Sequence, residues 1–120
     1  MRQTKATNPH TRTLISELRK LSTERKAPIW KTVAYELSRP SRHRREVNLS
    51  RLQSYAKDKE IALVPGKVLG AGNLNKKITV AAWKFSGDAF KKIQLTGSKA
   101  ISIPQLMKEN PNGKGVRIIG

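Results

Sequence analysis

The chain has 120 residues, of which 37% are hydrophobic and 5% aromatic, and it contains no cysteine. This length fits one domain with a modest aliphatic core, and the missing thiols exclude disulfide bonds and thiolate metal sites. The net charge is +17, from 25 basic and 8 acidic residues. Because like charges on a compact body repel one another, this excess predicts a polyanionic partner, with nucleic acid as the first candidate.

Membrane association is the main competing explanation of the charge. The longest apolar runs, residues 61–64 and 78–83, are far shorter than the ~20 residues that a membrane-spanning helix needs. The basic N-terminus leads into no apolar signal region, and no amphipathic segment with a basic rim is left over once a core is built. We therefore expect a soluble intracellular protein that makes no membrane contact.

Two helices are predicted in the first third of the chain. Asn8 and Pro9 supply an N-cap and a first helical residue, and apolar residues at helical spacing extend the pattern over residues 9–24. A second apolar stripe, residues 30–37, predicts another helix that ends before Pro40. Because their connection is short, the two helices should form an antiparallel pair.

A basic segment separates the helical pair from the rest of the chain. Residues 38–45 read SRPSRHRR, so five of the eight are arginine or histidine. Such a segment cannot bury itself and is typical of an exposed loop. We therefore divide the chain into an N-terminal part, residues 1–45, with the arm, the helices and this loop, and a compact α/β part, residues 46–120.

The second part alternates short strands with short helices. Strands are predicted at residues 47–49, 61–64, 67–69, 78–82, 100–102 and 116–119. The second of these ends at Pro65-Gly66, and the third ends at the glycines of residues 70–72. Helices are predicted from Ser50 to Asp58, after an N-cap at Ser86, and from Pro104. Strand followed by short helix thus occurs three times, which predicts an α/β fold built from small repeated units.

The glycines of residues 66–72 resemble a nucleotide-binding loop only superficially. A P-loop closes on Gly-Lys-Ser/Thr before a helix, whereas here Gly-Lys comes first and no hydroxyl residue follows it. The dinucleotide motif needs a third glycine where Asn75 stands. We interpret the segment as a turn, and an enzyme that binds a nucleotide there remains a disfavoured hypothesis.

Catalytic and metal-binding chemistry has little support in the sequence. His10 and His43 are the only histidines, carboxylates are scarce, and no nucleophile elbow is present. We therefore predict no enzyme, no metal, no cofactor and no small-molecule substrate.

The aromatic side chains have two interpretations. Trp83 and Phe85 flank Lys84, an arrangement that could stack nucleic-acid bases beside a phosphate contact. Core packing is favoured for most aromatics, including Trp30 and Tyr35, because a small domain needs its large apolar side chains.

Arginine is concentrated in the first half of the chain, which holds nine of the ten arginines. Arginine makes planar, bidentate and stacking contacts, so close RNA contacts are expected mainly there. The candidate RNA-binding residues are Arg2, Lys5, Arg12, Arg39, Arg42, His43, Arg44, Arg45, Asn48, Arg51, Lys67, Lys76, Lys77 and Lys84.

Several motifs along the chain resemble one ribosomal protein family. The motifs are REVNLSRL at residues 45–52, VPGKVLG at 64–70, TVAA at 79–82, FSG at 85–87, and the tail from Asn110. Together they resemble large-subunit ribosomal protein eighteen-e, of archaeal length, a family related to bacterial ribosomal protein fifteen. The sequence departs from that family at Arg45, where proline is common, and at Ser98, where a second glycine is common.

The resemblance carries implications for fold and function. It implies a helical pair plus a domain of irregular β-β-α units, and a structural role in the large ribosomal subunit that supports translation. The implied partners are large-subunit rRNA and neighbouring ribosomal proteins in the cytoplasm, without homo-oligomerisation. The alternative hypothesis is a free nucleic-acid-binding protein of the chromatin type, which the charge alone would equally allow.

Overall fold

The computed structural model describes residues 9–38, 45–57 and 60–119. Its elements follow in the order α1 (Pro9–Arg25), α2 (Pro28–Ser38), β1 (Arg45–Asn48), α3 (Leu49–Tyr55), β2 (Ile61–Leu69), β3 (Thr79–Phe85), α4 (Gly87–Leu95), β4 (Lys99–Ser102), α5 (Ile103–Glu109) and β5 (Val116–Ile118). This confirms the predicted α/β class and the N-terminal helical pair.

All described strand pairs are parallel, and β2 lies at the centre of the sheet. The order is β1-β2-β3-β4, and β5 also pairs with β2. β1 pairs with the second half of β2, at 66–69, whereas β5 pairs with its first half, at 61–63. Because β3 occupies the other edge of β2, β1 and β5 follow one another along the same edge of that strand.

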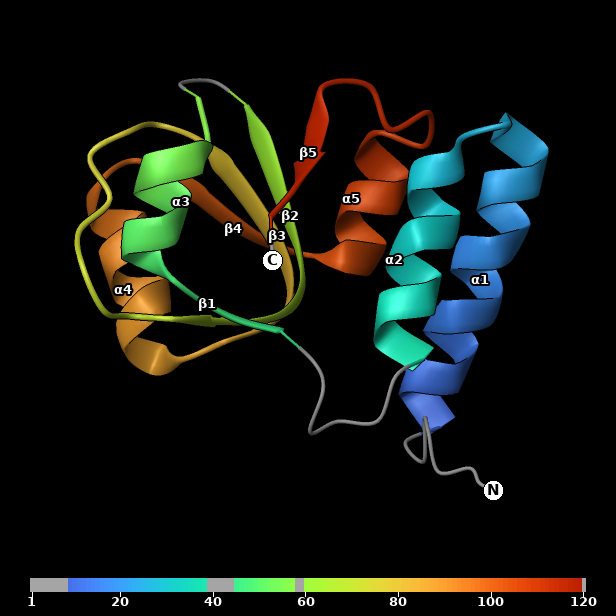
Figure 1. Ribbon diagram of the computed structural model, residues 1–120, viewed down its shortest axis with the longest axis horizontal. Coiled ribbons are helices and arrows are strands. Elements are labelled where there is room, and N and C mark those ends of the chain that lie inside the picture. Colours follow the sequence, from blue (N-terminus) through green and yellow to red (C-terminus); the bar gives the residue numbers. More distant parts are fainter. Residues whose placement is uncertain (1–8, 39–44, 58–59, 120) are drawn as a thin grey trace.

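Helices cover both faces of the sheet, as a parallel sheet requires. One core cluster joins α3 and α4 to one face through residues such as Leu52 and Ile93, with Val64 and Val80 from the strands. The other joins α1, α2 and α5 to the opposite face. Figure 1 shows these two groups of helices on either side of the strands.

The helical pair shares its core with the sheet. Leu18, Trp30 and Leu37 are fully buried in the same cluster as Leu63 of β2. The Trp30 indole Nε1 also donates a hydrogen bond of 2.8 Å to the Pro111 carbonyl, far along the chain. The two N-terminal helices and the sheet therefore share one core cluster. The division of the chain into two parts after residue 45 stays a prediction.

The three strand-then-helix units predicted from the sequence are β1–α3, β3–α4 and β4–α5. Ser86 caps α4 by accepting a hydrogen bond of 3.1 Å from the Ala89 backbone N–H. Ser102 caps α5 in the same way, so that this helix begins at Ile103, one residue before the predicted proline. Each cap satisfies a backbone donor that the first helical turn leaves unpaired.

The prediction that a strand ends at Pro65-Gly66 was wrong. β2 runs unbroken from Ile61 to Leu69, and the two predicted strands are halves of it. Proline lacks the N–H that a parallel ladder uses, and such residues are tolerated at bulges. The register of β2 against β3 shifts between Val64 and Lys67, so an irregularity in the pairing accommodates the proline and the strand continues.

The aromatic predictions were partly wrong. Tyr35 is 62% exposed, because its position on α2 lies off the stripe of buried residues. Trp83 and Phe85 lie within β3, which extends beyond the predicted end at residue 82. Both are half-buried against the core clusters, and Phe85 meets Phe90 edge to face at 6.3 Å between ring centroids.

Ser98, one of the departures from the family pattern, is a buried polar residue with a defined role. Its hydroxyl accepts a hydrogen bond of 3.0 Å from the Ile78 N–H and donates one of 2.8 Å to the Lys76 carbonyl. The Thr96 hydroxyl donates a third, at 3.1 Å. The serine therefore joins the loop after α4 to the segment before β3. A glycine at this position would leave the Ile78 N–H and the Lys76 carbonyl without the hydroxyl that binds them.

Candidate nucleic-acid interface

Helix α3 presents one apolar face and one polar face. Leu49 and Leu52 are fully buried under the sheet, whereas Arg51 and Tyr55 are exposed on the outer side. The Arg51 guanidinium carbon lies 4.9 Å from the centroid of the Tyr55 ring. Residues four apart on a helix are neighbours, so the i,i+4 spacing itself brings the cation over the ring.

Asn48 and Ser50 fix the start of this helix. Asn48 has extended backbone geometry at the N-cap position, without a hydrogen bond from its side chain to the helix. The Ser50 N–H instead donates to the Ala71 carbonyl at 3.1 Å. The loop that follows β2 therefore satisfies a helix donor that a side-chain cap usually takes.

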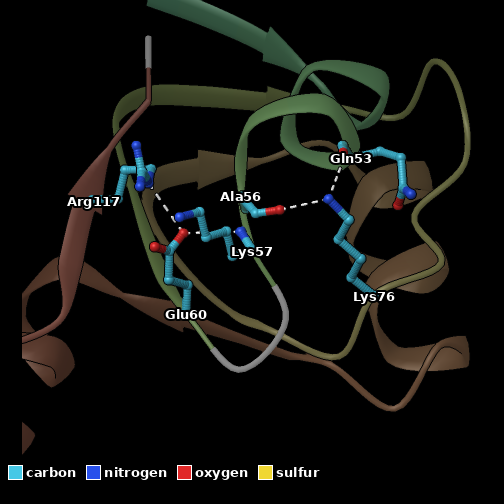
Figure 2. A network of polar contacts seen from close by, with 6 residues as sticks. All are labelled: Gln53, Ala56, Lys57, Glu60, Lys76 and Arg117. Atoms are coloured by element: carbon cyan, nitrogen blue, oxygen red, sulfur yellow. Dashed lines mark hydrogen bonds and ion pairs between the residues drawn. The ribbon is translucent and has the colours of Figure 1, made fainter.

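Lys76 closes the other end of α3. Its ammonium donates hydrogen bonds to the carbonyls of Gln53, at 2.7 Å, and Ala56, at 2.6 Å (Figure 2). The Gln53 side chain in turn accepts a hydrogen bond of 2.7 Å from the Asn75 N–H. Because the last carbonyls of a helix lack intrahelical donors and carry partial negative charge, Lys76 acts here as a C-terminal cap.

The neighbouring Lys77 is exposed. The two adjacent lysines, indistinguishable in the sequence, thus have different surroundings: one ammonium is bound within the protein, whereas the other side chain lies at the surface.

Lys67 and Lys84 form a second basic pair. They are register partners on the adjacent strands β2 and β3, and both are exposed. Strands in a sheet are about 4.8 Å apart, so the two side chains start close together, and like charges at such positions destabilise a sheet. Glu46 of β1 is the register partner of Lys67 on its other side, leaving a row of two cations and one carboxylate.

The glycine loop after β2 packs against the protein's own helices. A Cβ at Gly70 would overlap the Asp88 carboxylate, and one at Gly72 would lie 2.6 Å from the Ser50 Cβ. Gly72 also has a φ of +90°, which favours glycine. The Lys92 ammonium donates to the carbonyls of both glycines, at 2.8 and 3.3 Å. Close packing thus accounts for Gly70 and Gly72. The predicted turn over residues 66–72 was wrong in its first half, because residues 66–69 belong to β2.

Some basic groups are engaged by acids on the same chain. The Arg117 Nε donates to the Glu60 carboxylate at 3.1 Å, and the Lys57 backbone N–H donates to the same oxygen at 2.9 Å (Figure 2). These contacts, the Lys57 backbone hydrogen bond first and the Arg117 side chain second, hold the pKa of Glu60 below its usual value. Lys92 lies 3.7 Å from Asp88.

Internal pairing cannot neutralise the chain. Even if each of the 8 acids paired with a different basic residue, the 25 lysines and arginines would leave an excess equal to the net charge of +17. The predicted polyanionic partner therefore rests on composition, and the fold decides which cations remain available to it.

The structure brings together some of the candidate residues named from the sequence. Arg51 lies on α3, and the last carbonyls of this helix bind Lys76, the neighbour of Lys77 in the sequence. Lys67 and Lys84 are paired in the sheet. Arg12 is exposed on α1 and has a further interaction within the protein. Arg45 opens β1, opposite Gly66. The candidates outside the described residues are Arg2, Lys5, Arg39, Arg42, His43 and Arg44.

Sequence reasoning missed Tyr55 as a candidate. The signal was present, because Arg51 and Tyr55 are four residues apart in a segment whose leucines at 49 and 52 mark the buried side. Among residues 9–38, 45–57 and 60–119, no group of three or more histidine, cysteine or acidic side chains is placed to hold a metal ion. No helix in these ranges is long and apolar enough to cross a membrane.

The fold and the charge together define a small, strongly basic α/β protein. The family model for ribosomal protein 60S L18 and 50S L18e matches residues 1–120. The chain therefore belongs to that family: it is a structural ribosomal protein of the large-subunit type, not an enzyme, and its location is the cytoplasmic ribosome.

Curated relatives agree with this assignment. Proteins described as large ribosomal subunit protein eL18 are 44% identical in Methanococcus maripaludis, over 99% of both chains, and 46% identical in Archaeoglobus fulgidus, over 93% of this chain and 96% of the relative. The protein of that description in Methanopyrus kandleri is 45% identical over 94% and 93%. These matches confirm the family resemblance drawn from the motifs, and its archaeal character.

Proposed function

We propose that this protein binds large-subunit rRNA by neutralising its phosphates and so stabilises the folded arrangement of that RNA. The observation that carries the proposal is the excess of 25 basic over 8 acidic residues, which internal ion pairs cannot remove. Each cation brought to a phosphate releases a condensed counterion, which makes binding favourable at low salt. Within the ribosome, rRNA is the polyanion that family membership makes available.

Two basic groups of the described body support this mechanism. The first surrounds α3 and consists of Arg51, Lys57 and Lys77, all exposed. The second is the register pair Lys67 and Lys84, whose mutual repulsion a phosphate would relieve. We leave Lys76 out of the contact surface, because two carbonyls already bind its ammonium.

The Arg-rich segment completes the proposed surface. Arg39, Arg42, His43 and Arg44 lie in the sequence between the end of α2 and the start of β1. Together with Arg2, Lys5, Arg12 and Arg45 they stay predicted contacts. Because the core under α1 and α2 is continuous with the sheet, phosphates bound at separate places on the described body would be held at fixed relative positions.

The experiment is a salt titration of binding to an in vitro transcript of large-subunit rRNA. The logarithm of the affinity should fall linearly with the logarithm of the salt concentration, by about 0.7–0.9 per phosphate contact. Lys67→Met combined with Lys84→Met should make the slope shallower by about 1.4–1.8 if each lysine contacts one phosphate. Lys108→Met, on α5 and outside the proposed surface, serves as the charge-matched control and should leave the slope unchanged.

Two results would overturn the proposal. Affinity for the transcript that does not change with salt would eliminate phosphate neutralisation as the mechanism. Sedimentation tests the alternative of a free, chromatin-type protein: the chain should travel with the large subunit at moderate salt, and recovery mainly with DNA would favour that alternative. Contacts with neighbouring ribosomal proteins and the absence of homo-oligomers remain predictions for crosslinking within intact subunits.

A further inference from the structure

The outer face of α3 carries an aromatic ring that the core does not use. Tyr55 is 57% exposed, and the Arg51 guanidinium lies 4.9 Å from its ring centroid. The helix is anchored without this ring, because Leu49 and Leu52 are fully buried and Ala56 is 1% exposed. An exposed aromatic residue is unremarkable by itself, whereas a ring with a guanidinium over it presents a cation and an aromatic group together at the surface.

A purely structural role for the pair has a limited effect. Side chains four apart on a helix stabilise it only slightly. The structure provides stronger constraints on the same helix: the Ser50 N–H is bound by the Ala71 carbonyl at its start, and Lys76 binds two carbonyls at its end. The Arg51–Tyr55 pair is thus carried on a helix that other contacts already hold.

This rigidity matters for binding. A side chain mounted on a fixed helix loses less freedom when a ligand stacks on it than one on a free loop. Tyrosine has two side-chain torsions before its hydroxyl, and the ring is already oriented by the guanidinium beside it. The pair is therefore preorganised to receive a planar group.

The surroundings indicate which planar group is suitable. Lys57 follows Tyr55 by two residues, and Lys77 follows the lysine that caps α3; both side chains are exposed. A planar ligand attached to a phosphate chain would find the Arg51 cation at the aromatic ring itself. Bases in a duplex are stacked on one another, whereas unpaired bases in loops and bulges stack on tyrosine rings and arginine planes.

We propose that Arg51 and Tyr55 form a stacking platform for one unpaired base of the bound RNA. The inference rests on the proposed rRNA binding and adds to it a contact with a base, separate from the contacts with phosphates. Tyr55 would offer its exposed ring and Arg51 its guanidinium plane, with Lys57 and Lys77 engaging the adjoining backbone. Such stacking tolerates any base, since every base has a π-face.

The test compares two probes on the full-length protein: a short oligoadenylate, and an abasic oligomer with the same number of phosphates. Tyr55→Leu keeps apolar bulk but removes the ring, Tyr55→Phe keeps the ring, and Tyr35→Leu is the control for loss of another exposed tyrosine. Tyr55→Leu should weaken oligoadenylate binding about fivefold or more, without changing the affinity for the abasic oligomer or the salt slope. Tyr55→Phe and Tyr35→Leu should bind like the parent.

Arg51→Lys provides a second, independent variant, because it keeps the charge and removes the plane. It should also weaken oligoadenylate binding selectively. If Tyr55→Leu and Arg51→Lys leave oligoadenylate binding unchanged, or weaken both probes equally, the platform does not exist. Failure of the proposed rRNA binding is a different outcome, since the parent protein would then show no salt-dependent affinity for either probe.

Discussion

Replacing Lys76 by methionine tests whether a lysine that the sequence marks as an RNA contact is a structural cap instead. Methionine keeps an unbranched apolar stem and removes the ammonium. The change leaves the carbonyls of Gln53 and Ala56 without the donor that lies 2.7 and 2.6 Å away. Adjacent Lys77, exposed and identical in charge, provides the matched control through Lys77→Met.

The expected magnitude follows from the two contacts. A hydrogen bond that involves a charged group contributes a net ~1.5–3 kcal/mol, and a cation at a helix C-terminus adds about 0.3–1 kcal/mol. Lys76 is half-buried, so water replaces part of what is lost. We expect Lys76→Met to lower the free energy of unfolding by about 1–3 kcal/mol, against less than about 0.5 kcal/mol for Lys77→Met.

Urea unfolding followed by far-ultraviolet circular dichroism measures both variants, and rRNA affinity is measured on the same preparations. The two lysines should separate: Lys76→Met loses stability and keeps the salt slope of binding, whereas Lys77→Met keeps stability and loses slope. Equal stabilities, together with weaker RNA binding by Lys76→Met, would show that the ammonium faces the RNA and that the capping interpretation is wrong.

Three further substitutions test other contacts. Ser98→Ala should destabilise the fold by about 1–3 kcal/mol in a urea titration, because it leaves buried backbone groups without their partner; an effect near zero would show that water takes over. Gly72→Ala should lower Tm, since residue 72 has a φ of +90° and an added Cβ would lie 2.6 Å from the Ser50 Cβ; an unchanged Tm would mean that the loop moves freely. Glu60→Gln tests pH dependence: the folded pKa of Glu60 is lowered, so its carboxylate stabilises the fold above its ordinary pKa of 4.5, and this contribution disappears as pH falls through the folded pKa. The variant should therefore melt earlier than the parent at pH 7 and converge with it in acid, and a constant difference in Tm would contradict the role of the charge.

Local signals explain what could be predicted of the fold. The cap at Ser86, the start of a helix near Pro104 and the apolar stripes of α1 and α2 depend on residues a few positions apart, so they can be read from the sequence. The continuation of β2 through Pro65 could not, because it depends on a bulge against β3. The pairing of β1 and β5 with one edge of β2 is equally non-local.

The candidate site divides in the same way. Composition predicted a polyanionic partner, and motifs predicted the family. The different surroundings of Lys76 and Lys77 could not be predicted, because they depend on carbonyls at the end of α3, which β2 separates from these lysines in sequence. The exposure of Tyr35 could have been predicted, because this residue lies off the apolar stripe that the sequence already marks on the second helix.

The placement of β1 and β5 along the same edge of β2 also bears on how the chain folds. One edge of β2 is fully hydrogen-bonded only when both β1, which precedes it in the chain, and β5, near residue 118, have paired with it. Pairings between such distant segments form slowly, and partly folded chains with open strand edges tend to aggregate. Repulsion between copies that each carry +17 opposes this association. The charge that we assign to RNA binding would then also protect the chain during the interval before its sheet closes.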